Sequence, residues 1–196
     1  MIVCDKPRIE SMQLRLFDEP LRGHGHVRVV SGNMAETMTA AFTGGTRIST
    51  DSRADYCPDV VAEIEGRKVF IECKAVGLSN ETFVYHGRLE KDRLFAAEHS
   101  LMYAIWRHRA ATKKCSTVQQ LQAAWLTSLE AAYLVPFKDF FDIAIGSGIE
   151  KLNSAYGSSR TQPKMYGSGY RVRLAKLAAW KVLEFANNSR KPRTAY

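Results

Sequence analysis

The chain has 196 residues, of which 45% are hydrophobic and 24% charged, and its formal net charge is +8. A chain of this length and apolar content can fold as one domain without disulfide staples, so we expect its four scattered cysteines to be reduced thiols. No apolar stretch approaches the roughly 18 residues of a membrane span, and the first 20 residues lack the apolar run of a secretory signal, so we expect an intracellular protein.

The first clear element is a short helix over residues 34–42, where apolar side chains recur at helical spacing before the Gly44-Gly45 pair. The 30 residues before it show no clear pattern, and Ser31-Gly32-Asn33 indicates a break. We therefore expect His24 and His26 on a polar loop, where an H-x-H pair without a third ligand is usually exposed to solvent.

Two strands are predicted next, over residues 59–64 and 68–75, because both segments are rich in β-branched and apolar residues. The three residues between them, 65–67, predict a hairpin turn. Successive side chains of a strand point to opposite faces, so Cys73 lies on one face, and Glu72 and Lys74 share the other.

The rest of the chain alternates helices and strands. A helix is predicted over 88–100, a strand over 101–106, a basic loop over 107–114, and a helix to about residue 130 that begins at the capping-box pattern Ser116-Thr-Val-Gln119. A strand over 132–135 and a closing helix over 174–185 follow. This order predicts a mixed α/β domain with a central mixed sheet flanked by helices.

Basic charge is concentrated at the C-terminal end. Residues 151–196 contain ten Lys or Arg and one Glu, a net charge of +9, whereas the first 150 residues carry −1. Such asymmetry favours a polyanionic partner, and the interleaved Gly and Tyr residues are typical of loops that follow a nucleic-acid backbone. The alternative is a solvated tail. We expect residues 1–150 to hold the chemistry and a basic C-terminal extension, 151–196, to pack on the same domain and bind the partner.

Two short motifs suggest a metal site. Pro58-Asp59 opens the first hairpin strand and Glu72-Cys73-Lys74 lies on the second, so the hairpin can bring two carboxylates and an ammonium together. Two carboxylates at short range repel unless a cation lies between them, and oxygen ligands suit Mg²⁺ or Mn²⁺. The backbone carbonyl of Cys73 is a further candidate ligand. In the structural alternative, Asp59 is a turn residue, and Glu72 and Lys74 form an ion pair.

A metal at this position polarises a phosphodiester and lowers the pKa of a bound water. Lys74 would then orient that water or stabilise negative charge on the phosphate. Asp51 and Asp55 precede the motif and are alternatives to Asp59 as a ligand if the strand begins early.

Pro58-Asp59 and Glu72-Cys73-Lys74 resemble the two central motifs of the PD-(D/E)XK nuclease superfamily, which has a restriction-endonuclease-like core. The resemblance covers about residues 32–107. It implies Asp59 and Glu72 as metal ligands, Lys74 as the catalytic lysine, and Glu36, on the helix before the first core strand, as a further ligand. The small size and the early Glu look most like Holliday-junction resolvases, which implies a homodimer that cuts branched DNA.

Several basic residues are candidates for binding DNA, because they follow the catalytic strand, lie in the basic loop, or belong to the basic C-terminal extension. They are Arg88, Lys91, Arg107, Arg109, Lys113, Lys114, Arg160, Lys164, Arg171 and Arg173.

We therefore expect a Mg²⁺- or Mn²⁺-dependent DNA endonuclease in the cytoplasm or nucleoid; a phage origin would suit the unfamiliar flanks. The alternatives are a restriction, repair or recombination nuclease of the same superfamily, and a nucleic-acid-binding protein that keeps the fold without cutting. The non-cutting alternative predicts metal-independent binding with a steep salt dependence. Truncation after about Gly148 should weaken binding more than cleavage, provided that the closing helix is not needed for folding.

Overall fold

The computed structural model describes residues 19–48, 57–110, 112–151 and 168–185. Its helices are α2 (His24–Thr43), α3 (His86–Ala96), α4 (Val118–Thr127) and α5 (Phe137–Gly146), with 3-10 helices η2 (Thr112–Lys114) and η3 (Leu174–Trp180). Its strands are β1 (Thr46–Arg47), β2 (Val60–Ile64), β3 (Arg67–Val76), β4 (Glu81–Tyr85), β5 (Leu101–His108), β6 (Leu129–Pro136), β7 (Ile149–Lys151), β8 (Ser168–Arg173) and β9 (Lys181–Glu184).

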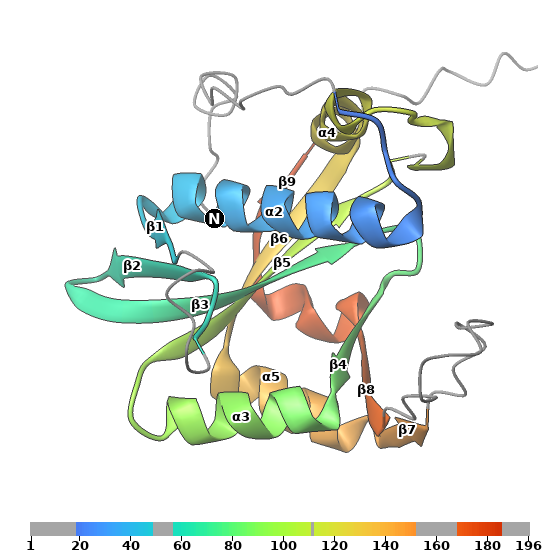
Figure 1. Ribbon diagram of the computed structural model, residues 1–196. Helices are drawn as coiled ribbons and strands as arrows, with labels where there is room; N and C mark the ends of the chain where they lie inside the picture. The colour runs from blue at the N-terminus through green and yellow to red at the C-terminus, as the bar shows by residue number, and fades with distance from the viewer. Residues whose placement is uncertain (1–18, 49–56, 111, 152–167, 186–196) are drawn as a thin grey trace, which may run out of the picture.

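A six-stranded mixed sheet forms the centre of the molecule, in the order β1-β2-β3-β5-β6-β9. Strands β3 and β5 are parallel, and every other neighbouring pair is antiparallel. Figure 1 shows α2 and α4 on one side of this sheet and α3 and α5 on the other. The prediction of a central mixed sheet flanked by helices is confirmed.

Two apolar cores lie on the two faces of the sheet. Met34 and Met38 of α2 and Trp125 of α4 pack with Ile71 on one face, and Leu89 of α3 and Phe140 of α5 pack on the other. A second sheet, in the order β4-β8-β7, lies on the α3 and α5 side. The alternation predicted for residues 69–74 holds, because Val69, Ile71 and Cys73 face the α2 core and Phe70 packs against the other.

The first helix is twice as long as expected. The predicted break at 31–33 is wrong, because α2 runs without interruption from His24 to Thr43. Val30, Met34 and Met38 are spaced four residues apart, so they form one buried stripe that packing against the sheet stabilises despite Gly32. The predicted end is right: Gly44 adopts a left-handed conformation, φ 67°, and its N–H donates to Ala40.

The predicted closing helix over 174–185 is wrong. Residues 174–180 form η3, and residues 181–184 form β9, which pairs with β6. Leu174, Leu177 and Trp180 are spaced three apart, which matches the three residues per turn of a 3-10 helix. The exposed edge of β6 offers backbone partners to residues 181–184, so sheet pairing there outweighs helix propensity.

Other predicted boundaries shift by a few residues. The cap of α4 is Thr117 and not Ser116: its hydroxyl accepts from the Gln120 amide, 3.2 Å. That helix ends at Thr127, and β6 begins at Leu129, which pairs with His108 of β5, while Glu130 lies at an irregularity in this pairing. Strand β5 extends to residue 108, and α3 covers 86–96 in place of 88–100. Helix α5 and strands β4, β7 and β8 were not expected.

The C-terminal residues are interwoven with the rest of the fold. Strand β8 lies between β4 and β7, and β9 is an edge strand of the central sheet. Tyr170, Val172, Leu174 and Leu177 are buried in the core beneath α3 and α5. Truncation after Gly148 would therefore remove strands from both sheets and leave buried apolar surface exposed.

Candidate active site

The site lies where β2 and β3 separate. Val60, the first residue of β2, pairs with Ile71, and no residue of β2 pairs with β3 beyond that point. Strand β3 continues to Val76 and is paired there with β5 alone among its two neighbours, β2 and β5. Asp59 stands at this fork. Its N–H donates to the Ile71 carbonyl, 3.1 Å, and its carbonyl accepts from Ile48, 2.9 Å, so its backbone is held between β1 and β3.

Beyond the end of the β2 pairing, the Asp59 carboxylate takes the place of a strand as a hydrogen-bond partner of β3. It accepts a hydrogen bond from the Cys73 N–H, 2.8 Å, and it is buried. The N–H and carbonyl of one strand residue point to the same edge, so the Cys73 carbonyl also points toward the Asp59 side of β3. A carboxylate and a backbone carbonyl oxygen therefore face the same fork.

Burial raises the pKa of Asp59 to about 6, and the negative charge of Glu72 adds to the rise. The Cys73 N–H and the ammonium of Lys74 act in the opposite direction. Burial and the repulsion from Glu72 therefore outweigh the two contacts that favour the charged form of Asp59.

Glu72 is buried on the other face of β3, with an ion pair to each of its carboxylate oxygens. The ammonium of Lys74 lies 2.5 Å from Oε1, and the guanidinium of Arg88 contacts Oε2. Burial alone would raise the pKa of Glu72, but the positive charges of Lys74 and Arg88 outweigh it and lower the pKa. Glu72 is therefore held as a carboxylate.

Arg88 connects Glu72 to a buried polar pair beneath α3. Its Nε lies 3.3 Å from Oδ1 of Asp92, one helical turn later, and Asp92 is fully buried. Oδ2 of Asp92 accepts a hydrogen bond from the Tyr103 hydroxyl. Tyr103, on β5, stacks on Phe140 with 4.0 Å between ring centroids, so this pair is fixed by the core.

Glu36 approaches the fork from α2. Its Oε2 accepts from Nη2 of Arg47, 2.6 Å, and Arg47 also donates to Thr37 and Asn33 of the same helix. After burial and the charge of Glu72, the charge of Glu36 is a further contribution that raises the pKa of Asp59. Glu36 therefore acts electrostatically on Asp59, and Arg47 ties β1 to α2 beside it.

The donor set suits a hard divalent cation. Two carboxylates and a backbone carbonyl are oxygen ligands of the kind that Mg²⁺ and Mn²⁺ prefer, and the raised pKa of Asp59 marks negative charge that a cation would compensate. Over the described ranges, no three His, Cys, Asp or Glu side chains converge as a ready metal cluster. Both oxygens of Glu72 already contact a positive side chain, so a cation that binds Glu72 competes with Lys74 and Arg88 for its negative charge.

The Cys73 thiol faces away from this site, as the strand alternation predicts. It is buried in the α2 core and its Sγ lies 3.3 Å from Oγ1 of Thr39. Burial raises the pKa of this thiol. The same Thr39 hydroxyl oxygen accepts from Nε1 of Trp106, 2.8 Å, so the contact belongs to the packing of α2 on the sheet.

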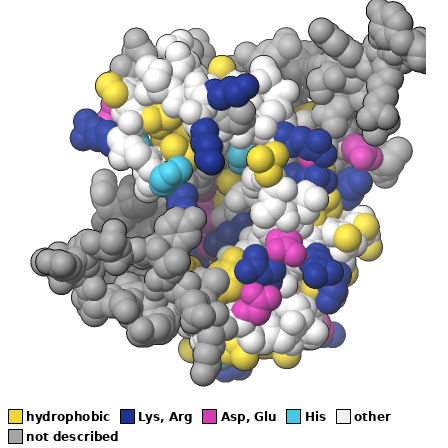
Figure 2. Space-filling view, turned by 90° about the vertical axis from the view of Figure 1, so that its right-hand side faces the viewer, with side chains coloured by type: hydrophobic (Ala, Val, Ile, Leu, Met, Phe, Trp, Pro, Cys, Tyr) yellow, Lys and Arg dark blue, Asp and Glu magenta, His cyan; other side chains and the backbone are white. Residues whose placement is uncertain are grey.

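Of the eight basic residues that were expected to bind DNA and that the structure describes, five have acidic partners, and Arg88 is one of them. Arg107 and Arg109 both pair with the buried Glu130, and Arg171 and Arg173 pair with Glu81. Figure 2 shows Lys and Arg side chains in several separate places on one face, some beside Asp or Glu. Lys91, Lys113 and Lys114 are exposed. Arg160, Lys164, Asp51 and Asp55 lie outside the described residues.

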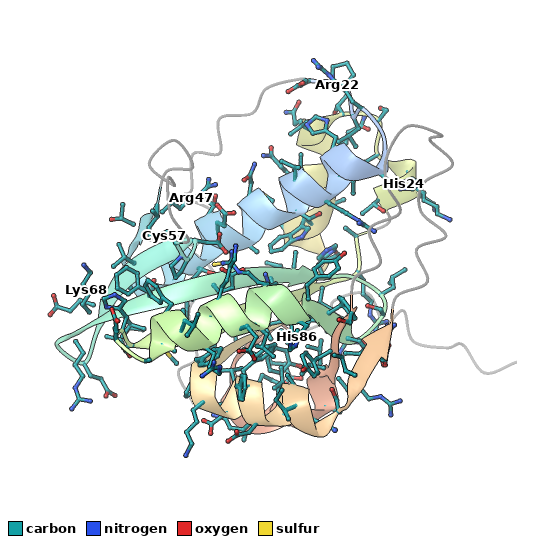
Figure 3. All side chains as sticks on the ribbon, turned by 60° about the horizontal axis from the view of Figure 1, so that its bottom comes forward. Arg22, His24, Arg47, Cys57, Lys68 and His86 are labelled. Atoms are coloured by element: carbon teal, nitrogen blue, oxygen red, sulfur yellow. The ribbon has the colours of Figure 1, made fainter. Side chains whose placement is uncertain are left out.

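The H-x-H pair lies elsewhere. His24 and His26 are in the first turn of α2 and not on a loop, because the helix begins ten residues earlier than expected. Nδ1 of His26 accepts from the Arg22 amide, 3.2 Å. Figure 3 shows His24 and Arg47 at opposite ends of α2, so His24 is remote from the fork.

Sequence reasoning missed the pairs that hold the acidic residues. Asp92 had a detectable signal, because it lies three residues after the buried Leu89 and thus on the inward face of α3. Arg88 and Asp92 are four apart, a spacing that favours a helical ion pair. Arg47 had no such signal in the sequence, since its approach to Glu36 depends on the pairing of β1 with β2.

No protein-family model matches the chain, and no curated protein matches it in sequence. Among solved structures, Hjc of Archaeoglobus fulgidus, a Holliday junction resolvase from an archaeal hyperthermophile, is similar with a TM-score of 0.42 and 15% identity. The match covers 79% of this chain and 92% of that one. We therefore derive the chemistry of the site from its own residues.

Proposed function

We propose that this protein is a divalent-metal-dependent endonuclease of the PD-(D/E)XK superfamily that hydrolyses DNA phosphodiester bonds. One observation carries the proposal: the carboxylate of Asp59 is held on the backbone of the Glu72-Cys73-Lys74 segment, at the point where β2 and β3 separate. The two motifs are thirteen positions apart in sequence and meet in the fold. The pKa of Asp59, raised to about 6 chiefly by burial and then by the charge of Glu72, supports a site that a cation completes.

Asp59, Glu72 and the Cys73 carbonyl would hold the Mg²⁺ or Mn²⁺ ion, with Glu36 as a further ligand. When bound there, a divalent cation supplies Lewis-acid polarisation of the phosphate and a water of lowered pKa. Lys74 places an ammonium beside Glu72, where it orients the attacking water or stabilises charge on the phosphate. Desolvation at the fork strengthens these interactions, because Asp59 and Glu72 are both buried.

The proposed substrate is branched DNA of the Holliday-junction type, cut by a homodimer with one site per strand. Exposed Lys91, Lys113 and Lys114 and the basic residues 151–196 would bind the phosphate backbone. Arg107, Arg109, Arg171 and Arg173 would add to this binding through guanidinium nitrogens beyond those that meet their acidic partners. Residues 32–107 would hold the catalytic core.

The test is a cleavage assay on four-way junction, flap, nicked and linear duplex DNA at one salt concentration, with Mg²⁺, with Mn²⁺ and with EDTA. Asp59→Ala, Glu72→Ala and Lys74→Ala are each expected to abolish cleavage and to leave DNA binding largely intact. Glu63→Ala is the matched control, because Glu63 is an exposed carboxylate on β2, next to the same hairpin turn. It should cleave like the parent chain.

Three outcomes separate the alternatives. Junction-selective products support the resolvase-like activity, and products from the other substrates indicate a different nuclease of this superfamily. Metal-independent binding with no products would refute cleavage and favour a binding protein. Light scattering of the full chain reports the oligomeric state, and a monomer would contradict the proposed dimer.

A further inference from the structure

Both oxygens of the Glu72 carboxylate are occupied by positive side chains. Lys74 binds Oε1 and Arg88 binds Oε2, and only a few per cent of the Glu72 side chain is exposed. A metal ligand needs an oxygen directed at the ion. In the proposed nuclease, the divalent cation must therefore compete with these two positive side chains for Glu72.

Of these two partners, Arg88 is the one that can move away from Glu72. Lys74 comes from the same strand, two residues after Glu72, and its ammonium also lies 6.0 Å from the centre of the Tyr103 ring. Arg88 instead reaches Glu72 from α3, and its side chain is 30% exposed. Its terminal nitrogens can therefore turn toward solvent without disturbing β3.

Asp92 supplies the pivot for that movement. It is fully buried, contacts Nε of Arg88 at 3.3 Å, and is itself held by the Tyr103 hydroxyl. This ion pair at Nε would keep the guanidinium beside Asp92 while a terminal nitrogen exchanges one acceptor for another. A guanidinium of this geometry suits the oxygens of a phosphate, to which it can donate two parallel hydrogen bonds.

We propose that Arg88 exchanges partners during the reaction, leaving Glu72 for a non-bridging oxygen of the scissile phosphate while Asp92 retains its Nε. In DNA-free protein, Arg88 competes with the divalent cation for Glu72. In the DNA complex, Arg88 contacts the phosphate and stabilises the negative charge that develops there, which makes it a catalytic residue. This inference rests on the proposed nuclease function and assigns Arg88 a role that neither short motif contains.

The test measures Mn²⁺ affinity and DNA cleavage separately in the full chain. Arg88→Gln removes the charge but keeps an amide donor for Asp92, Arg88→Lys keeps the charge, and Arg93→Gln removes an exposed charge from the same helix. Titration of DNA-free protein with Mn²⁺ is expected to show about tenfold tighter binding for Arg88→Gln. Arg93→Gln and Arg88→Lys should bind Mn²⁺ like the parent chain.

Single-turnover cleavage at saturating Mn²⁺ gives the second measurement. Arg88→Gln is expected to cleave about a hundredfold more slowly, Arg88→Lys to recover part of that loss, and Arg93→Gln to cleave normally. Unfolding curves in EDTA show whether each variant remains folded. If Arg88→Gln does not fold, the cleavage rates of Arg88→Lys and Arg93→Gln are compared instead. Equal rates for these two variants would overturn the proposal.

The two expected results for Arg88→Gln, tighter Mn²⁺ binding and slower cleavage, can also fail separately. Unchanged or weaker Mn²⁺ binding would overturn the competition for Glu72, and normal cleavage would overturn the contact with the phosphate. The metal titration needs no cleavage, so absence of products from the parent chain refutes the proposed function while the titration still decides the competition.

Discussion

Replacing Asp59 by Asn should stabilise the metal-free protein while abolishing its activity. Asn is nearly the same size as Asp, and its carbonyl oxygen can still accept the Cys73 N–H that Asp59 accepts at 2.8 Å. The substitution therefore removes a buried negative charge without removing the hydrogen bond. It also removes the repulsion between Asp59 and Glu72.

The size of the effect follows from the pKa of Asp59, which burial first, and then the charge of Glu72, raise from 3.8 to about 6. This difference corresponds to about 3 kcal/mol. Between these two pKa values the folded protein binds more protons than the unfolded chain, so its stability falls as the pH rises. The cost is absent below the unfolded pKa and complete above the folded one. Asp59→Asn should therefore raise the free energy of unfolding by about 3 kcal/mol near neutral pH and by little near pH 4.

Urea unfolding of the full chain in EDTA, near neutral pH and at about pH 4, measures this difference. Asp142→Asn is the matched control, because Asp142 is an exposed carboxylate on α5, and it should show no such pH-dependent gain. Added Mn²⁺ should raise the stability of the parent chain but not of Asp59→Asn. Equal stability of the parent and Asp59→Asn near neutral pH would refute the conclusion that the buried charge of Asp59 destabilises the folded protein.

Three further predictions concern the scaffold. A Cβ on Gly169 would come within 2.4 Å of a backbone oxygen of β4, so Gly169→Ala should lower the unfolding free energy by about 2 kcal/mol, whereas Gly146→Ala, in open space, should not; urea unfolding compares them. Thr39→Val leaves the buried Trp106 N–H without its acceptor and should cost about 1–3 kcal/mol in the same assay; no loss would contradict this role. Burial lowers the pKa of His108 to about 4, so the folded protein resists a proton that the unfolded chain accepts, and stability falls as the pH drops from about 6.5 to 4. His108→Asn should reduce this acid-side loss by about 3 kcal/mol, and an unchanged acid slope in urea unfolding would count against it.

Local patterns were sufficient to predict the hairpin and the faces on which its side chains lie. The strands around residues 59–64 and 68–75 follow from β-branched residues and a short turn, and the period of two places Glu72 and Lys74 together. The end of α2 follows from Gly44, which takes a left-handed conformation at low cost. These features depend on residues close together in the chain, so the sequence displays them directly.

Longer-range features escaped because their energies come from partners distant in sequence. Residues 181–184 were predicted as the end of a helix over 174–185 but pair with β6, about 50 positions earlier. The break expected at 31–33 is overridden by a buried stripe against the sheet. Propensities of a few tenths of a kcal/mol per residue are easily outweighed by burial of a whole face.

The candidate site divides in the same way. The identities of Asp59, Glu72 and Lys74 and their approximate meeting at one hairpin are written in the two motifs. Tertiary structure alone decided that Arg88 binds Glu72 from α3 and that Tyr103 of β5 binds Asp92 beneath that helix. The reason is that a buried charge needs partners wherever the fold brings them, and sequence spacing does not encode contacts between separate elements.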